Sequence, residues 1–254
     1  MLYAAKSHIG LVRQMNQDGY AVVSNQKPWH FYVVADGMGG PSAGEVASRI
    51  AVETVTDFVK AKMNESGTEP AELLREAVYH ANQKIFVSAK ETEEYFGMGT
   101  TLVCTLVNDK EVVFAHVGDS RGYIYQNHKL SQITKDHSLV AELVRRGQLT
   151  EEEARHHPQR NIVTRSLGTQ EYSYPDVDKV AWNQGDVLLL CSDGLSNLIY
   201  FDELQSFLAK VSKIETVSGL NTVADAMIRM ALERGAPDNI TLVLVLHREE
   251  GQVA

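Results

Sequence analysis

Five aspartates stand next to short apolar or β-prone segments, where a strand would reach the surface of a folded core. They are Asp18, Asp36, Asp119, Asp193 and Asp238. Each of them taken singly is more often a turn residue than a ligand. If the segments share one β core, the five carboxylates can meet at one edge. Carboxylates that close together repel one another, and bound cations remove the repulsion.

The residue types at these positions indicate which cations would fit. Carboxylates together with a glycine carbonyl suit hard divalent ions, Mg²⁺ or Mn²⁺, and do not suit zinc. Two such ions ~3.5–4 Å apart can share a water, lower its pKa and clamp an in-line displacement at phosphorus. Arg13, five residues before Asp18, has a guanidinium able to grip two oxygens of a phosphate monoester. Taken alone, Arg13 is more readily read as a surface arginine than as a phosphate ligand.

The elements that must position these acids follow from the apolar pattern. A buried strand should deliver Asp36 to its end, and the glycines of Gly37-Met-Gly-Gly40 should then turn the backbone sharply. Short strands before the first helix favour antiparallel pairing, and the segments from 100 to 133 favour a continuing meander. Strands are expected at about 2–9, 20–24, 31–36, 100–107, 111–117, 121–126, 130–133, 187–191 and 240–246, and helices at about 43–63, 70–91, 202–211 and 216–234.

A polar, weakly patterned stretch from about 137 to 168 interrupts this order, and we call it the flap. Ser138 and Thr150 are candidate helix N-caps within it, and Thr150-Glu-Glu-Glu153 fits a capping box. Because we find no internal repeat or linker, we expect a single domain spanning residues 1–254, from which the flap projects.

Composition excludes several classes of protein. A formal charge of −9 argues against nucleic-acid binding. No apolar run approaches the ~18–20 residues of a membrane helix, and the N-terminus lacks the features of a secretory signal. The two cysteines, Cys104 and Cys191, lie in apolar runs and are expected to be buried and unpaired. These features predict a cytoplasmic protein without membrane insertion.

Seven motifs occur in an order and spacing that resembles the metal-dependent protein serine/threonine phosphatases (protein phosphatase 2C type), and most closely the compact bacterial branch. They span nearly the whole chain: Arg13-x-x-Asn-Gln-Asp18, Asp36-Gly-Met-Gly-Gly40, Gly97-Met-Gly-Thr-Thr101, Val117-Gly-Asp-Ser-Arg121, Asp136-His-Ser138, Ser192-Asp-Gly-Leu195 and Asp238-Asn-Ile-Thr241.

The resemblance implies an α+β fold, a four-layer α/β/β/α sandwich of two antiparallel β-sheets flanked by antiparallel helix pairs. It also implies a metal site that binds Mn²⁺ or Mg²⁺. Asp36 would bridge two ions, and the carbonyl of Gly37 would bind one of them. Asp193 and Asp238 would complete the other, and Asp119 with Asp193 would hold a third, weaker ion.

The same resemblance implies the reaction and its substrate contacts. Arg13 would bind the substrate phosphate, and Asp18 would act through a water. The expected activity is hydrolysis of phosphoserine and phosphothreonine in proteins by metal-activated water, without a phosphoenzyme intermediate. The expected partners are phosphorylated proteins, including a Ser/Thr kinase that the enzyme opposes, and the expected form is a monomer.

Three positions depart from the family pattern. Gln17 replaces a more usual glutamate and removes one negative charge near the metals, so we expect an altered but active site. Met38 and Pro41 stand where some relatives carry histidine, which leaves the general acid unassigned. His156 and His157 on the flap are candidates for that proton, but solvated loop histidines are the plainer reading. A water on the metal ions is a further source.

Two other functions fit part of the sequence. A pseudophosphatase would bind phosphoproteins without cleaving them, and the intact acids argue against it. A two-metal hydrolase of small phosphates or nucleotides would use the same acids, although the motifs contain no base-stacking groove. Turnover with Mn²⁺ separates the first alternative from a phosphatase, and a comparison of phosphopeptide with nucleotide separates the second.

Overall fold

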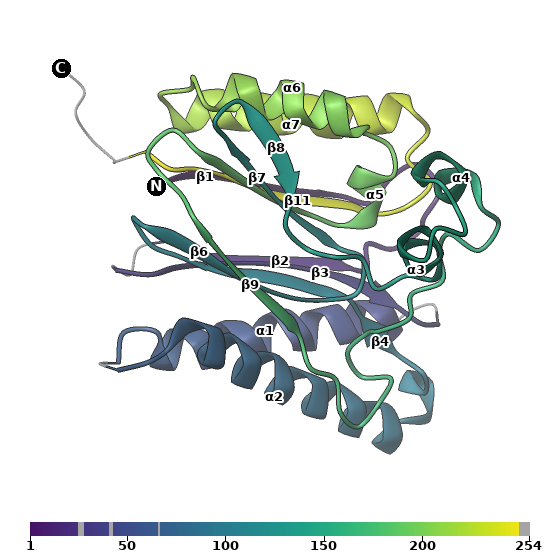
Figure 1. Cartoon of the computed structure of the whole chain (residues 1–254). Coiled ribbons are helices and arrows are strands. Elements are labelled where there is room, and N and C mark those ends of the chain that lie inside the picture. The colour runs from purple at the N-terminus through teal and green to yellow at the C-terminus, as the bar shows by residue number, and fades with distance from the viewer. Residues whose placement is uncertain (25–27, 41–42, 66, 249–254) are drawn as a thin grey trace.

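A computed structural model describes residues 1–24, 28–40, 43–65 and 67–248 of the chain. The described elements form four layers, with two antiparallel sheets face to face and a pair of long helices over each outer face (Figure 1). This is the α/β/β/α sandwich that the sequence motifs implied. Pro41, at which we noted a departure from the family pattern, lies outside the described residues.

The two sheets are built from strands that are far apart in the chain. The first sheet has the order β1-β11-β10-β7-β8, with β1 Leu2–His8, β11 Ile240–Leu246, β10 Val187–Cys191, β7 Arg121–Gln126 and β8 Lys129–Gln132. The second has the order β2-β3-β5-β6-β9, with β2 Asp18–Val23, β3 His30–Met38, β5 Leu102–Val107, β6 Glu111–Val117, β9 Asp176–Ala181, and the short β4 Gly99–Thr100 paired to β3.

Strand β3 shows why these segments read as continuous apolar runs. Phe31 and Val33 pack on the helix side of their sheet, whereas Tyr32 and Val34 pack between the two sheets. Alternate side chains point to opposite faces of a strand, and both faces here are covered. All four side chains are fully buried. Burial on both faces fixes the position of β3 in the sandwich, and therefore the position of the residues that follow its end.

Four helices cover the sandwich. The second sheet is covered by α1 Ala43–Lys62 and α2 Pro70–Glu91, and the first by α6 Phe201–Val211 and α7 Val217–Glu233. Each presents an apolar stripe at helical spacing to its sheet. Helix α2 starts with proline in its first turn, and Glu69 caps it by accepting the N–H of Glu72. The helix positions predicted from the sequence agree with the structure to within about one residue.

The expected meander does not continue through residues 100–133. Strand β6 belongs to one sheet and β7 to the other, because the chain crosses between the sheets at Gly118, whose φ is +104°. The first strand pairs with the last, β1 with β11, and not with β2. Strand β9 and the short helices α5 Asp193–Ser196 and η1 Glu93–Tyr95 were not predicted; β9 is an edge strand of partly exposed residues, so it lacks an apolar run.

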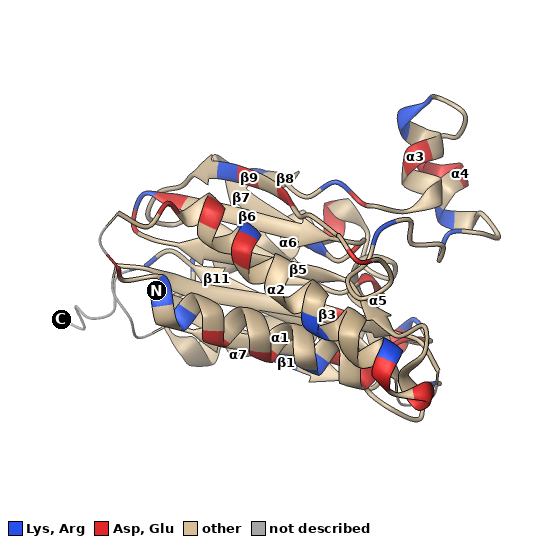
Figure 2. Ribbon diagram, turned by 90° about the horizontal axis from the view of Figure 1, so that it is seen from below, with Lys and Arg blue, Asp and Glu red and all other residues tan. Residues whose placement is uncertain are grey.

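The flap contains two short helices, α3 Leu139–Arg145 and α4 Glu151–His156. Ser138 and Thr150 cap them as predicted, and the capping box of Thr150 with Glu153 is confirmed. Figure 2 shows α3 and α4 projecting from one end of the molecule. Within the described chain, no helix combines the length and the apolar character that a membrane crossing requires.

Candidate active site

The five aspartates are brought to one end of the sandwich by both sheets. Asp18 is the first residue of β2 and lies directly opposite Asp36 of β3 in the strand register. Asp119 lies in the turn from β6 to β7, Asp193 opens α5 directly after β10, and Asp238 lies two residues before β11. Helix α5 and strand β4 lie at this end in Figure 1, next to the helices of the flap.

Electrostatic coupling shows that the five carboxyl groups are neighbours. Burial raises the pKa of Asp36 well above its usual range, and the negative charges of the other four aspartates raise it further. Burial and the charge of Asp238 raise the pKa of Asp193, and an interaction with Asp36 opposes this rise. Without cations, these groups cannot all ionise at neutral pH without strong mutual repulsion.

Asp119 and Asp18 lie on two sides of this cluster. Burial, followed by the charge of Asp193, raises the pKa of Asp119 to about 7, although Arg121 opposes the shift. Burial also raises the pKa of Asp18 to about 7, opposed by hydrogen bonds from Thr241 and Ser192. The proximity of Asp119 to Asp193 is what a shared cation between these two residues requires.

One oxygen of Asp18 is satisfied and the other is not. The Ser192 hydroxyl donates to Oδ2 at 2.8 Å. Oδ1 is buried and has no hydrogen-bond partner among the described residues. A buried carboxylate oxygen without a donor is costly. Oδ1 of Asp18 is therefore suited to accept a hydrogen bond from a water that belongs to the complete site.

The donor set fits hard divalent cations. It consists of carboxylates and a backbone carbonyl, which is the chemistry that Mg²⁺ and Mn²⁺ select. The raised pKa values of Asp36, Asp119 and Asp193 and the orphaned oxygen of Asp18 are the marks of a cluster that lacks positive charge. The residues present therefore fit the metal ions that the motifs imply.

Arg13 lies beside the acids and remains accessible. Its Nη2 donates to Oδ2 of Asp238 at 2.8 Å, and 52% of the arginine side chain is exposed. The hydrogen bond to Asp238 raises the pKa of Arg13, and the charges of Asp36 and Asp193 add to the effect. A guanidinium that is aligned by one carboxylate and half open to solvent can bind the oxygens of a phosphate.

Close backbone contact joins the first motif to the glycine turn. The N–H of Gly37 donates to the carbonyl of Gln17 at 3.1 Å, and a Cβ at Gly37 would lie 2.0 Å from the carbonyl oxygen of Gly44. Only glycine fits there. The Gln17 side chain donates through Nε2 to the carbonyl of Gly40 at 3.3 Å. A carboxylate could not make this bond, so the amide of Gln17 links the two motifs.

Asn239 is a functional residue to which the sequence reasoning gave no role. Its Oδ1 accepts the N–H of Gln17 at 2.8 Å, and its Nδ2 donates to the carbonyls of Ile9 and Met15 at 2.8 and 3.0 Å. Asn239 is buried, and its hydrogen bonds attach the loop that carries Arg13 to the segment that carries Asp238. The signal was present, because Asn239 belongs to a quoted motif, but its partners lie more than 200 residues away along the chain.

Asp136 forms a separate, satisfied ion pair. The Arg121 guanidinium donates Nε to Oδ2 at 2.9 Å and Nη2 to the same oxygen at 2.6 Å, and Gln132 donates to Oδ1. The charge of Asp136 raises the pKa of Arg121, although burial opposes it. A carboxylate with this many donors holds the β7 end in place, and it does not belong to the group of five.

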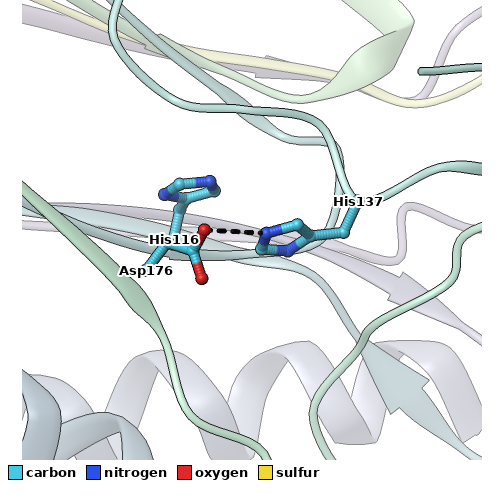
Figure 3. Close-up of side chains that lie close together, drawn as sticks. All are labelled: His116, His137 and Asp176. Carbon is cyan, nitrogen blue, oxygen red and sulfur yellow. Dashed lines mark ion pairs between the residues drawn. The ribbon is translucent and has the colours of Figure 1, made fainter. Parts of the chain in front are cut away.

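A cluster of histidines lies at the base of the flap (Figure 3). His116, His137 and Asp176 place one potential ligand atom each within 4.8 Å of one another. Nδ1 of His137 accepts the N–H of Gly118 at 3.0 Å, so the neutral ring carries its proton on Nε2. Arg165 lies 2.8 Å from that Nε2 and donates to Asp176 at 2.8 Å. Because a guanidinium already occupies this position, we assign the cluster to hydrogen bonding and place no cation there.

The two flap histidines lie on α4 and directly after it. His156 is exposed, and its Nε2 lies 3.2 Å from Oε1 of Glu152 one turn earlier. His157 caps the end of α4, and its Nδ1 accepts the N–H of Gln159 at 3.1 Å. The structure thus gives both residues local partners on the flap itself.

Comparisons with known proteins agree with this geometry. The family model described as Protein phosphatase 2C matches residues 6–233. The serine/threonine phosphatase stp of Listeria monocytogenes is 40% identical over 237 residues, which cover 93% of this chain and 92% of the relative. The crystal structure of the serine/threonine phosphatase Stp1 from Staphylococcus aureus superposes with a TM-score of 0.88 at 36% identity, covering 98% of this chain and 96% of the other. The catalytic domain of PstP, solved in complex with 2 manganese ions, superposes with a TM-score of 0.80 at 34% identity, covering 95% and 96%.

Proposed function

The chain belongs to the protein phosphatase 2C family, and on this basis we propose that it hydrolyses phosphoserine and phosphothreonine in proteins as a metal-dependent serine/threonine phosphatase. The observation that carries the proposal is the convergence of five aspartates from both sheets on one edge, where burial and neighbouring charges raise the pKa values of Asp36, Asp119 and Asp193. Such a cluster gains stability and function together when divalent cations bind.

Each aspartate has a proposed part in holding Mn²⁺ or Mg²⁺. Asp36 would hold two ions, together with the carbonyl of Gly37 for one and with Asp193 and Asp238 for the other. Asp119 with Asp193 would hold a third, weaker ion, which the effect of the Asp193 charge on the pKa of Asp119 supports. When bound, the ions would neutralise the carboxylates and lower the pKa of a water for attack on phosphorus.

The remaining residues bind and orient. Arg13, aligned by Asp238, binds the non-bridging oxygens of the phosphate and holds the ester in line with the attacking water. Asp18, held by Ser192, directs its orphaned Oδ1 toward that water and accepts a hydrogen bond from it. Asn239 keeps the Arg13 loop and Asp238 in register.

The proposed reaction has no phosphoenzyme intermediate. Cys104 and Cys191 are free and fully buried. Burial raises the pKa of the Cys191 thiol to about 12 and raises that of Cys104 further. A thiol phosphatase needs an accessible thiolate, and these two cysteines provide none. Attack by water in a single displacement is the chemistry that remains consistent with the site.

We extend the proposal to the whole chain. Residues 1–254 form one catalytic domain, and residues 137–168 form a flap beside the acids that contacts the protein substrate. The enzyme acts as a monomer in the cytoplasm, consistent with its unpaired cysteines. Its partners are phosphorylated proteins, including a Ser/Thr kinase whose action it reverses.

Substitution of the bridging acids tests the proposal. Asp36→Ala and Asp193→Ala should each abolish Mn²⁺-dependent cleavage of p-nitrophenyl phosphate and of a phosphothreonine peptide. Asp57→Ala, which removes an exposed acid from α1, is the matched control and should retain full activity. Retention of most activity in the first two variants would reject the site. If the unsubstituted protein binds the phosphopeptide but does not cleave it, it is a pseudophosphatase. If it cleaves a nucleotide in preference to the phosphopeptide, it is a small-molecule hydrolase.

A further inference from the structure

The two ends of the flap are fastened to each other. The N–H of Thr164 donates to the carbonyl of His137 at 2.8 Å, and the N–H of Leu139 donates to the carbonyl of Ile162 at 2.9 Å. Ser138 and Val163 form an antiparallel bridge between these bonds. The flap therefore leaves and rejoins the body as one paired stem, so that a movement of its helices must act on the residues at the base of this stem.

One side of the stem is clamped to the residue before Asp119. The N–H of His137 donates to the carbonyl of Gly118 at 3.0 Å, and the N–H of Gly118 donates to Nδ1 of His137 at 3.0 Å. A Cβ at Gly118 would lie 2.6 Å from the Thr101 side chain, and its φ is +104°. Two reciprocal hydrogen bonds tie Gly118 to His137, so displacement of His137 acts on the backbone that carries the Asp119 carboxylate.

The other edge of the His137 imidazole faces Arg165, in the returning end of the flap, and Asp176, in β9. Its Nε2 lies 3.4 Å from Oδ2 of Asp176, and Arg165 donates to Oδ1 of the same carboxylate at 2.8 Å. His116 stacks on the ring with centroids 4.9 Å apart and 12° between the planes. Burial and the adjacent Arg165 lower the pKa of His137 to about 4, which preserves Nδ1 as an acceptor at neutral pH.

We propose that His137 is a positioning residue that couples the flap to the Asp119 corner of the site, and hence to the weaker third cation. The inference rests on the proposed role of Asp119 as a ligand. A flap in its present position keeps the Gly118 clamp closed and the Asp119 carboxylate in place. Binding of the third cation at Asp119 in turn stabilises the flap in that position, because coupling between two sites is reciprocal.

The other side of the stem is attached to the body in a different way. Leu167 and Thr100 exchange two backbone hydrogen bonds of 2.8 and 3.1 Å, and Thr100 pairs with Gly37. These bonds do not depend on any side chain. His137 is thus the point at which a substitution can separate the flap from the site while leaving the other attachment intact.

The test uses three substitutions and a control in the full chain. His137→Leu removes the contacts of both ring nitrogens, with Gly118 on one edge and with Arg165 and Asp176 on the other. His137→Asn keeps an acceptor close to the position of Nδ1 and should restore the clamp. Asp176→Asn weakens only the contact at the Nε2 edge of the His137 ring. His247→Asn is the control, because His247 is a second buried histidine, stacked on Trp182 with centroids 4.6 Å apart, at the opposite end of β11 from Asp238.

Manganese titration without substrate gives the first readout. Free Mn²⁺ is followed by electron paramagnetic resonance, and the weak binding class is identified as the one lost in Asp119→Ala. We expect His137→Leu to bind that class about 10-fold more weakly, as is usual when a residue that orients a metal ligand is removed. The tight sites should be unchanged, and His137→Asn and His247→Asn should match the wild type to within about threefold.

Hydrogen exchange of the flap gives the second readout. Mn²⁺ should slow exchange in residues 139–163 of the wild type, but not in His137→Leu, and only partly in Asp176→Asn. Wild-type Mn²⁺ binding and flap protection in His137→Leu, together with loss of the weak class in Asp119→Ala, would overturn this inference alone. An unchanged titration in Asp119→Ala would instead overturn the ligand role of Asp119 and this inference with it. If His137→Leu does not fold, flap protection in Asp176→Asn equal to the wild type would overturn the inference.

Discussion

Two buried groups of titratable side chains lie next to each other in this protein, and their pKa values are shifted in opposite directions. In the aspartate group, burial and mutual repulsion raise the pKa of Asp36, Asp119 and Asp193. In the histidine group, burial lowers the pKa of His116 and His137. Asp119 and His116 are separated by only two residues, so the difference does not come from their place in the fold.

The difference lies in the charge that each group buries. The histidine group has Arg165, Asp176 and backbone groups as neighbours and its rings remain neutral, although Nδ1 of His116 is buried without a hydrogen-bond partner among the described residues. The aspartate group is an excess of like charge, and one oxygen of Asp18 has no donor among the described residues. An excess of buried like charge is normally compensated, so the aspartate group indicates an absent cation. Proximity of possible metal ligands is therefore weaker evidence for a metal site than uncompensated charge.

The largest effect is expected for Asp36, where one substitution should lower activity and raise the stability of the metal-free protein. Asp36→Asn should lower Mn²⁺-dependent turnover by about a thousandfold or more, since the bridging carboxylate is lost. The same change should raise the free energy of unfolding of the metal-free protein by about 2 kcal/mol, because it replaces a buried acid, whose raised pKa makes its burial costly at neutral pH, with a neutral amide. His137→Leu should destabilise the protein by about 2 kcal/mol, because it leaves Gly118 without an acceptor.

Urea denaturation in the presence of a chelator measures both stabilities, and a phosphopeptide assay measures turnover. Asp57→Asn, on the exposed face of α1, serves as the control. A loss of stability in metal-free Asp36→Asn would break the comparison, since it would mean that the protein already satisfies the aspartate group.

The second prediction concerns how the stabilisation by Mn²⁺ changes with pH. Asp18 and Asp119 have pKa values of about 7 in the folded protein, against an ordinary value of 3.8. Between these pH values the folded state holds more protons than the unfolded chain, so the metal-free protein loses stability from these groups as the pH rises. Cations bind the deprotonated acids. The gain from Mn²⁺ should therefore grow from pH 5 to pH 8, reaching about 2.7 kcal/mol per site at a hundred times the dissociation constant.

Urea denaturation at four pH values, with and without Mn²⁺, measures this gain directly as a difference. The subtraction removes the opposite contribution of the histidines, whose lowered pKa values make stability rise with pH. A gain that is independent of pH would show that the aspartates are already ionised without cations.

The sequence was sufficient for the features that are repeated along the chain or local to a segment. Apolar runs located β3, which carries Asp36, and β10, which ends two residues before Asp193, and helical spacing located α1, α2, α6 and α7. The capping box at Thr150 depends on residues only three positions apart and was also predicted. The grouping of the five aspartates followed from their common place at strand ends, although their individual roles came from the family resemblance.

What could not be predicted depends on contacts between distant segments. The crossing of the chain at Gly118 and the pairing of β1 with β11 are choices of sheet, which apolar runs do not encode. Asn239 and His137 make their decisive hydrogen bonds with backbone groups, whose positions are unknown until the fold is built. No spacing rule distinguishes such an asparagine or histidine from one in a surface turn.

The third prediction concerns Arg13, for which we propose a role in joining the aspartate group to the substrate. Arg13→Ala should lower kcat/KM for p-nitrophenyl phosphate by about 10-fold to 100-fold, because a charge-assisted phosphate contact is lost. Arg13→Lys should recover part of the lost kcat/KM, since lysine restores the charge but not the paired N–H donors of the guanidinium. The free energy of unfolding should change by less than about 0.5 kcal/mol, because the Arg13–Asp238 pair is exposed. A stability loss equal to the activity loss would show that Arg13 is structural.

The smallest effects are expected for the flap histidines. His156 is exposed and lies against Glu152, and His157 bonds the backbone of Gln159. His156→Ala and His157→Ala should each keep kcat within about twofold of the wild type, as is usual for surface substitutions. The measurement is the pH dependence of kcat with a phosphothreonine peptide, whose alkoxide leaving group needs a proton more than nitrophenolate does. Selective loss of turnover on the peptide, with the aryl ester unaffected, would show that an exposed histidine enters the site when the flap closes on a protein substrate. The unsatisfied aspartates would then account for activation of the water, and the leaving-group proton would come from a residue whose burial in the free enzyme gave no indication of its role.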